Sequence, residues 1–289
     1  MNLRGEPAHV GRHCGASTYE VTREVVEFYQ EAQRDRCGLC REGDPALLYH
    51  SECYKFLAEW YLQNLIGNLH AQQDWEMFSP IPIGARVRTR STIIDRYRKR
   101  GRDYVVNETD VVADEDGRLL VRGRTHQSFL AGDVPKSGEF VVDESTAKAK
   151  APRPPFPTAT GPDLPSFEKV VDERRCWMFS GPGRNYHTDA EEARKLGFPN
   201  IVVQGMMSTC FAAQVMTERF GRGFLTGGRM SLKLTNVLWA GDSVTARAKV
   251  DRSEPEGTAT RTTCDVWVEK ADGTKVVIGT ASALEPPPH

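Results

Sequence analysis

The chain has 289 residues, of which 39% are hydrophobic and 27% charged, and its formal net charge is −1 at pH 7. This composition is typical of a globular protein, and the near-zero charge gives no overall attraction to nucleic acid or to an anionic membrane. The length favours two domains or one duplicated unit. No signal peptide is visible, and the longest apolar run, near Ile201 to Val215, is too short for a membrane span. Seven cysteines without a secretion signal favour reduced thiols and a cytoplasmic location.

The N-terminal part is expected to be helical after a short arm. Residues 1–15 are predicted to form a loose arm. Val21 to Tyr29 has apolar residues on one face and Thr22 as a candidate N-cap, so it predicts a short amphipathic helix. Cys53 to Ile66 repeats apolar residues at helical spacing and predicts a second helix.

The segment after Gly67 predicts strands. Alternation and β-branched residues place them at 74–78, 87–95, 104–112 and 119–129. Residues 96–103 are predicted to be a charged hairpin tip. Its five basic residues either grip a phosphate or keep a solvated hairpin from pairing at its edge, and the second interpretation is favoured.

The second half repeats the first after a proline-rich linker at residues 131–166. Strands are expected within Leu225–Val250, Ala259–Val268 and Lys275–Ala283. Gly84 and Gly117 in the first half are 33 positions apart, and their counterparts Gly241 and Gly273 are 32 apart. Such spacing indicates an internal repeat of an α+β fold, with one unit at 1–130 and the other at 167–289.

One motif of the second half carries the candidate chemistry. Trp177 to Asp189 is predicted to be a loop rich in glycine and proline that contains a single histidine, His187. Asp189 is expected to cap a short helix that ends at Leu196. The apolar stretch from Ile201 to Met216 predicts a helix buried on every side. Its opening turn, at Gly205, presents free backbone N–H groups, and a lone base facing such a helix start suits stabilisation of an enolate oxygen.

These residues resemble the MaoC-like hydratases and dehydratases. That family carries a loop Ser-Gly-Asp-x-Asn-Pro-x-His-x-Asp, followed by a hydrophobic helix that usually begins after His-Gly. Ser180, Gly181, His187 and Asp189 match the loop, and Gln204-Gly205 takes the place of the pair. Pro182 stands where the family has its catalytic aspartate, and Arg184 where it has asparagine, with Asn185 one residue later.

The resemblance implies a double hotdog fold in which only the second unit keeps the active loop. It implies that His187 is the acid or base and that the Gly205 N–H polarises a thioester carbonyl, so both are candidate catalytic residues, together with Asn185. Arg184, Tyr186, Gln204 and Ser208 are candidate substrate-binding residues, although a serine in an apolar helix often bonds back to the backbone. The substrate would be an acyl thioester of coenzyme A or of an acyl-carrier protein. The thioester is itself the chemical handle, so no metal or redox cofactor is required, and a homodimer is expected.

Two alternatives accompany this prediction. Because Pro182 cannot exchange protons, the protein is alternatively a single-base lyase, isomerase or cyclase, or an acyl-binding subunit without catalysis. Cys37, Cys40, His50 and Cys53 have the spacing C-x₂-C-x₉-H-x₂-C, which can close a tetrahedral zinc site. Burial of Cys53 as a small apolar residue is the favoured interpretation of that pattern.

Overall fold

The computed structural model describes residues 8–34, 69–130, 142–143 and 155–286, and within them all the strands form a single eleven-stranded sheet. The predicted helix at 53–66 and the predicted zinc ligands lie outside the described residues. No helix of the described part is both long and apolar enough to cross a membrane.

The first half contributes one helix and five strands to the described structure, and the segment after it contributes one short strand. The helix is α1 (Arg23–Gln33), which the Thr22 side chain caps by accepting a hydrogen bond from the Val25 N–H, as the sequence predicts. The strands are β1 (His13–Glu20), β2 (Leu69–Met77), β3 (Arg86–Lys99), β4 (Arg102–Ala113), β5 (Leu119–Leu130) and β6 (Val142–Asp143). The two-residue β6 lies beside β3 in parallel.

The second half contributes four helices and five strands. The helices are α5 (Glu173–Ser180), α6 (Ala190–Lys195), α7 (Gly205–Phe220) and α8 (Arg222–Gly227). The strands are β7 (Phe167–Val170), β8 (Arg229–Leu234), β9 (Ser243–Glu256), β10 (Ala259–Lys270) and β11 (Lys275–Glu285).

The sheet order is symmetric about its centre. It runs β1-β3-β4-β5-β2-β8-β11-β10-β9-β7, with β6 off this path, so each of the strands β1 to β5 has a counterpart at the same distance from the middle. The halves meet where β2 and β8 pair antiparallel, with Asp74 opposite Ser231. The turn glycines found in the sequence also correspond, because Gly84, Gly117, Gly241 and Gly273 all have positive φ angles that favour glycine. This architecture confirms the predicted α+β double hotdog; the unit limits at residues 130 and 167 stay a prediction.

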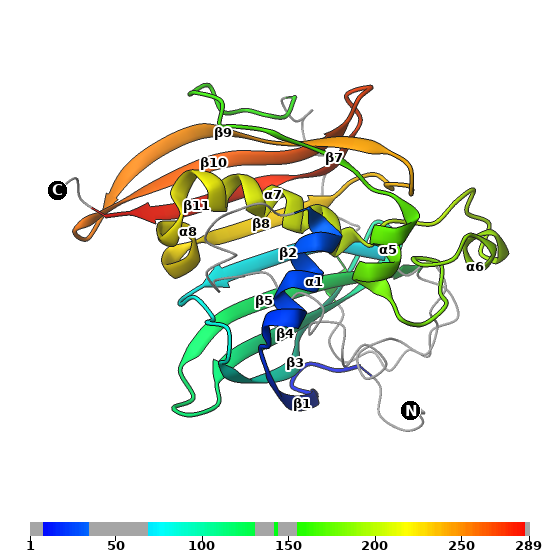
Figure 1. Cartoon of the computed structure of the whole chain (residues 1–289), viewed down its shortest axis with the longest axis horizontal. Helices are drawn as coiled ribbons and strands as arrows, with labels where there is room; N and C mark the ends of the chain where they lie inside the picture. The colour runs from blue at the N-terminus through cyan, green and yellow to red at the C-terminus, as the bar shows by residue number, and fades with distance from the viewer. Residues whose placement is uncertain (1–7, 35–68, 131–141, 144–154, 287–289) are drawn as a thin grey trace.

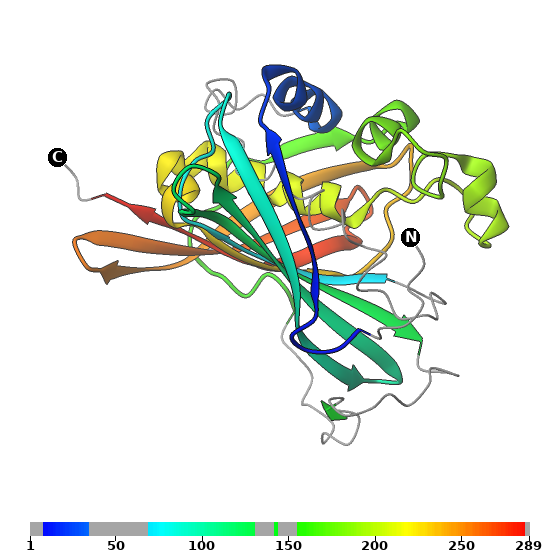
Figure 2. The ribbon, with the colours of Figure 1, turned by 90° about the horizontal axis from the view of Figure 1, so that it is seen from below.

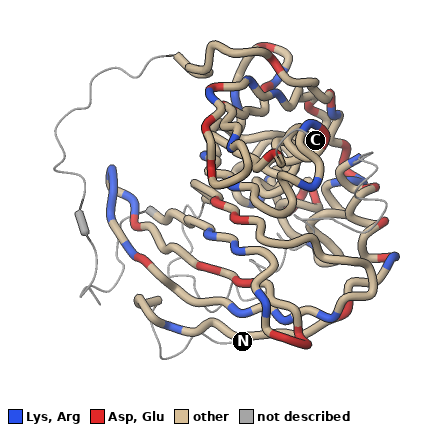
Figure 3. The backbone as a smooth tube through the Cα atoms, turned by 90° about the vertical axis from the view of Figure 1, so that its left-hand side faces the viewer, with Lys and Arg blue, Asp and Glu red and all other residues tan. Residues whose placement is uncertain are grey.

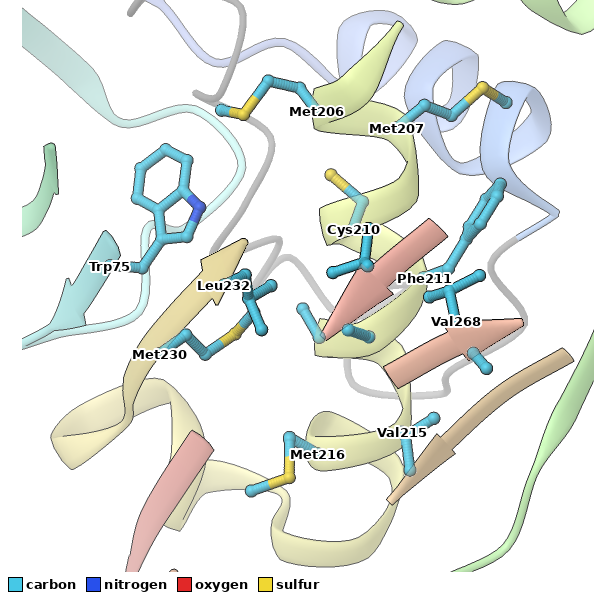
Figure 4. Close-up of a cluster of buried hydrophobic side chains, with 14 of the residues drawn as sticks. Trp75, Met206, Met207, Cys210, Phe211, Val215, Met216, Met230, Leu232 and Val268 are labelled. Carbon is cyan, nitrogen blue, oxygen red and sulfur yellow. The ribbon is translucent and has the colours of Figure 1, made fainter. Parts of the chain in front are cut away.

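The helices lie on one face of the sheet (Figures 1 and 2). The long helix α7 is buried along nearly its whole length, as its apolar sequence predicts, although it begins at Gly205 rather than at Ile201. Its Phe211 and Cys210 lie among side chains of the sheet, including Leu232 and Val268 (Figure 4). Burying these side chains contributes about 1.5–3 kcal/mol each for the larger ones.

Helix α1 joins the two halves. The ammonium group of Lys169, on β7, donates to the carbonyl oxygens of Gln33 (3.1 Å) and Arg34 (2.8 Å), which lie at the C-terminal end of α1. A cation at this end is favourable because helix carbonyl groups there lack partners and carry partial negative charge. The ring of Tyr29 also packs edge-on against Phe179 of α5.

Several predicted boundaries are wrong. Residues 13–15 belong to β1 rather than to an arm, because they pair with β3. Trp177 to Ser180 form the end of α5, which Asp172 caps through the Arg175 N–H, so only the rest of the motif is a loop. Leu225 lies in α8 and not in a strand. The charged tip is also shorter than expected, because β3 and β4 continue pairing as far as Lys99 and Arg102.

The end of the proline-rich segment is attached to the second half. One oxygen of the buried Asp265 carboxylate accepts three hydrogen bonds from this segment, from the Thr158 N–H (2.6 Å), the Thr158 hydroxyl (3.1 Å) and the Ala159 N–H (2.8 Å). Further along, Gly161 and Leu164 donate to carbonyl groups of β9. From Thr158 onward the chain therefore packs on β9 and β10 rather than behaving as a free linker.

The other face of the first half of the sheet is strongly charged. Asp110 accepts hydrogen bonds from both Arg90 and Arg122, and Glu108 accepts from Arg124. Residues of both signs alternate along these strands (Figure 3). Their carboxylates and guanidinium groups pair across neighbouring strands, so the sequence's many basic residues here are largely neutralised locally.

Candidate active site

His187 is fixed by the segment that leads into α7. Its Nδ1 lies 2.7 Å from the carbonyl oxygen of Val202, and the Val202 N–H in turn donates to the carbonyl oxygen of Tyr186 at 3.1 Å. A carbonyl oxygen only accepts, so the neutral imidazole carries its proton on Nδ1 and leaves a lone pair on Nε2. Nε2 is not hydrogen-bonded to any described residue. Burial lowers the pKa of His187 to about 4, so the ring is neutral near pH 7.

Asn185 shapes the loop that carries His187. Its side-chain oxygen accepts from the His187 N–H at 2.8 Å, and its amide nitrogen donates to the carbonyl oxygens of Gly183 (3.2 Å) and Ser180 (3.4 Å). Both ends of the side chain are thus engaged within the loop. This placement favours a role in positioning His187, and the catalytic role of Asn185 stays a prediction.

Gln204 and Gly205 form the start of α7 next to this loop. The Ser180 hydroxyl donates to the side-chain oxygen of Gln204 at 3.3 Å, and Gln204 makes no side-chain cap, so the first N–H groups of α7 are not satisfied by it. Gly205 is tightly surrounded, because a Cβ at this position would lie 2.1 Å from Leu234 Cδ2 and 3.3 Å from His70 Nδ1. The absence of a side chain at Gly205 therefore allows β2 and β8 to approach the helix start.

Arg184 points away from this group. Its guanidinium donates to Asp189 at 3.0 Å and to Glu191 at 3.2 Å on the exposed side of the loop. Asp189 meanwhile caps α6 through the Glu191 and Glu192 N–H groups, as the sequence predicts. These interactions lower the pKa of the Asp189 carboxyl, with the Arg184 hydrogen bond as the main cause. Two carboxylates already neutralise Arg184.

The remaining candidate residues, Tyr186 and Ser208, lie on the loop and in α7. The ring of Tyr186 lies 3.9 Å from that of His187, measured between centroids, and also contacts Phe198. Ser208 is buried within α7, one turn after Gly205. Pro182, in place of the family aspartate, is exposed on the loop. Hydrogen bonds thus join His187 to Asn185 and Val202, and Ser180 joins the same loop to Gln204 beside Gly205, whereas Arg184 lies on the outside.

Sequence reasoning missed His70. It comes from β2 of the first half, yet its Nδ1 is close to the start of α7 in the second half. Its Nε2 lies 3.1 Å from the Gln72 carbonyl oxygen, and burial lowers its pKa to about 4. No local pattern indicates this contact, because it arises only when β2 pairs with β8 across the centre of the sheet.

The fold of this chain is similar to that of several solved structures. No family model and no curated protein matches the chain. A solved MaoC-like dehydratase superposes with a TM-score of 0.74 at 18% identity, covering 96% of this chain and 98% of its own. A MaoC-like dehydratase from Phytophthora capsici gives a TM-score of 0.73 at 14% identity, covering 99% of both chains. A Mycobacterium tuberculosis protein described as having a double hotdog fold gives a TM-score of 0.62 at 12% identity, again covering 99% of both.

These likenesses extend over nearly the whole chain and agree with the symmetric strand order. The chain therefore has the double hotdog fold of the MaoC-like dehydratases.

Proposed function

We propose that this protein is an acyl-thioester lyase that adds water to an enoyl group, or removes it from a β-hydroxyacyl group, held on coenzyme A or a carrier protein. The observation that carries the proposal is the hydrogen bond from His187 Nδ1 to Val202. It leaves the basic lone pair on Nε2, which is not hydrogen-bonded to any described residue, and it ties His187 to a residue three positions before the start of α7. The solved MaoC-like dehydratases of the same fold support the reaction class.

A single imidazole suffices for the dehydration direction. Nε2 of His187 removes the proton from the carbon next to the thioester carbonyl, and the electron pair moves onto the carbonyl oxygen. The Gly205 N–H at the start of α7 stabilises that enolate oxygen. The imidazolium then returns the proton to the β-hydroxyl as its C–O bond breaks, so water leaves and neutral His187 is restored. Asn185 positions the loop, and Tyr186, Gln204 and Ser208 line the site.

Pro182 supports a second candidate function, isomerisation, for the same site. Water activation in the family that the loop resembles uses two side chains, and a proline cannot supply one of them. Moving a double bond needs only one base, which takes a proton from one carbon and returns it to another. An acyl-binding subunit without catalysis is the third possibility that the same substitution leaves open.

The deciding experiment incubates the purified protein in D₂O with trans-2-enoyl-CoAs of increasing chain length, beginning with crotonyl-CoA. A hydratase consumes the enoyl absorbance and yields a β-hydroxyacyl product. An isomerase incorporates deuterium and shifts the double bond without gaining oxygen. Binding with neither change supports the non-catalytic subunit. Absence of hydration for every substrate, in either direction, would overturn the lyase proposal.

A further inference from the structure

A second histidine, His70 of β2, packs against the start of α7 and takes no part in the proton transfers described for His187. A Cβ built on Gly205 would lie 3.3 Å from His70 Nδ1 and 3.6 Å from His70 Cβ, so the imidazole lies directly beside the first residue of the helix. An amide nitrogen is about 2.5 Å from the Cβ position of its own residue, which places His70 Nδ1 within about 6 Å of the Gly205 nitrogen. In the proposed function, the N–H of that nitrogen holds the thioester carbonyl oxygen.

A β-bulge in β2 turns His70 towards the helices. His70 lies opposite Gln127 of β5, and the next pair of these strands begins at Gln72, so Ala71 is an extra residue on β2. Trp75 belongs to the core that contains α7, and regular alternation from Trp75 would point His70 to the opposite face of the sheet. The extra residue reverses this direction, so that His70 faces the start of α7. Bulges beside active sites commonly re-aim a side chain in this way.

The backbone orients the ring of His70 as it orients that of His187. His70 Nε2 lies 3.1 Å from the Gln72 carbonyl oxygen, which can only accept, so the neutral imidazole carries its proton on Nε2 and its lone pair on Nδ1. Burial lowers the pKa of His70 to about 4, although hydrogen bonds to the Gln72 backbone and the Gln73 side chain favour the protonated ring. Near pH 7 the nitrogen that approaches Gly205 is therefore a hydrogen-bond acceptor.

The start of α7 is accessible from solvent. His70, His187 and Gly205 are each partly exposed, whereas residues 206–217 of the helix are buried. His187 is hydrogen-bonded to Val202, and His70 packs on Gly205, two positions whose Cα atoms are at most roughly 11 Å apart along the chain. The segment leading into the helix thus has one imidazole from each half of the chain attached to it.

We propose that His70 is a second catalytic residue, whose Nδ1 accepts a hydrogen bond from the water that adds to the β-carbon. The inference rests on the proposed function, because that function places the thioester at Gly205. It also supplies, from the other half of the chain, a water-orienting side chain that Pro182 cannot provide.

Both histidines begin and end the reaction neutral. In hydration, the water donates a hydrogen bond to His70 Nδ1 while its other proton moves to His187 Nε2. Its oxygen bonds to the β-carbon, and the electron pair of the double bond moves onto the thioester oxygen. The His187 imidazolium then protonates the α-carbon, and the electron pair returns from the oxygen. In dehydration the same steps run in reverse, and the departing hydroxyl keeps its hydrogen bond to His70.

The test separates water activation from proton transfer at the α-carbon. His70→Leu removes the acceptor and is expected to slow hydration of the best trans-2-enoyl-CoA by about 10²-fold or more. Exchange of the α-protons of the corresponding saturated acyl-CoA in D₂O, followed by mass spectrometry, requires His187 and Gly205 but no oriented water. This exchange should stay close to that of the unchanged protein in His70→Leu and be lost in His187→Gln. Unchanged hydration, or an equal loss of hydration and exchange, in a folded His70→Leu variant would overturn the inference.

Two amide variants test which nitrogen acts. The side-chain oxygen of His70→Asn can occupy the position of Nδ1, so this variant should recover about tenfold of the lost hydration, the contribution of one retained hydrogen bond. His70→Gln places its polar atoms near the position of Nε2 and should recover none; it replaces His70→Leu if that variant does not fold. Equal hydration by the two amide variants would contradict the assignment to Nδ1.

His13→Gln, at an exposed position of β1, is the control and should change neither rate. Hydration that does not depend on His70 overturns this inference alone. Absence of hydration and dehydration by the unchanged protein overturns the proposed function and the role of His70 together.

Discussion

His187 and Val202 are joined by a 2.7 Å hydrogen bond from the imidazole Nδ1 to the backbone carbonyl oxygen. Val202 also bridges to Trp239, and Val203 donates to the Leu238 carbonyl oxygen, so the acceptor is itself attached to the segment before β9. The histidine is therefore aligned by backbone rather than by a carboxylate. A backbone acceptor fixes the ring without adding a charge that would raise its basicity.

Replacing this imidazole should remove catalysis while preserving the fold. His187→Gln is expected to lower kcat by about 10²–10⁴-fold, the contribution of a general acid–base group. Circular dichroism and thermal unfolding should stay close to those of the unchanged protein, since the loop is held largely by Asn185. His13→Gln, at an exposed strand position, is the matched control and should retain full activity. A fully active His187→Gln variant would show that another residue moves the proton.

The pH dependence of kcat/KM should reflect the buried state of His187. Burial lowers its pKa to about 4, against 6.5 ordinarily, so the basic neutral form persists at more acidic pH. Between pH 7.5 and 5.5 the rate is expected to change less than about twofold, whereas a histidine of ordinary pKa would lose roughly tenfold. Initial rates with the best acyl-CoA substrate, measured where circular dichroism shows the folded state, provide the check. An acid limb centred near pH 6.5 would contradict the assignment.

A side chain at position 205 should destabilise the fold unless Leu234 is replaced by a smaller residue. The Cβ of Gly205→Ala would lie 2.1 Å from Leu234 Cδ2, so Leu234 must move, and we expect a loss of about 1–3 kcal/mol in the free energy of unfolding. Shortening that neighbour in the Gly205→Ala, Leu234→Ala double variant should relieve the clash. Urea unfolding of both single variants and the double variant measures the coupling. Strictly additive losses would mean that the contact does not limit this position.

Pro182→Asp tests whether the missing carboxylate limits hydration. If the loop keeps its shape, the new carboxylate stands near His187 and orients a water, so hydration of crotonyl-CoA should rise severalfold. Activity on the natural substrate should fall because the site has altered. Pro182→Asn supplies a similar side chain without the negative charge and is the control. If all rates stay flat while the variant remains folded, the single-base or the binding-only function replaces the hydratase.

Local chemistry made some elements predictable. Thr22 and Asp189 allowed the starts of α1 and α6 to be predicted, because a capping oxygen acts within three residues of its own position. The four turn glycines could be located because their positive φ angles favour a residue without Cβ. The apolar sequence of α7 likewise indicated a helix buried on all sides.

The features that could not be predicted depend on residues that are not adjacent in the sequence. β1 was missed at its start because its residues are mostly polar and Cys14 is its single deeply buried side chain. Asn185 is a candidate catalytic residue from its position in the motif, but the loop geometry that turns its amide towards Ser180 and the His187 N–H is absent from the sequence pattern. His70 joins the site only through the pairing of β2 with β8, which is a tertiary contact between halves.

The antiparallel pairing of β2 with β8 also determines what happens when the halves are separated. Each half alone would present a long strand whose backbone N–H and C=O groups have lost their partners, and unpaired edges of this kind recruit other strands. Expressing either half by itself should therefore give self-association or aggregation rather than a stable monomer. The single chain keeps these two edges paired with each other, so neither is offered to another molecule.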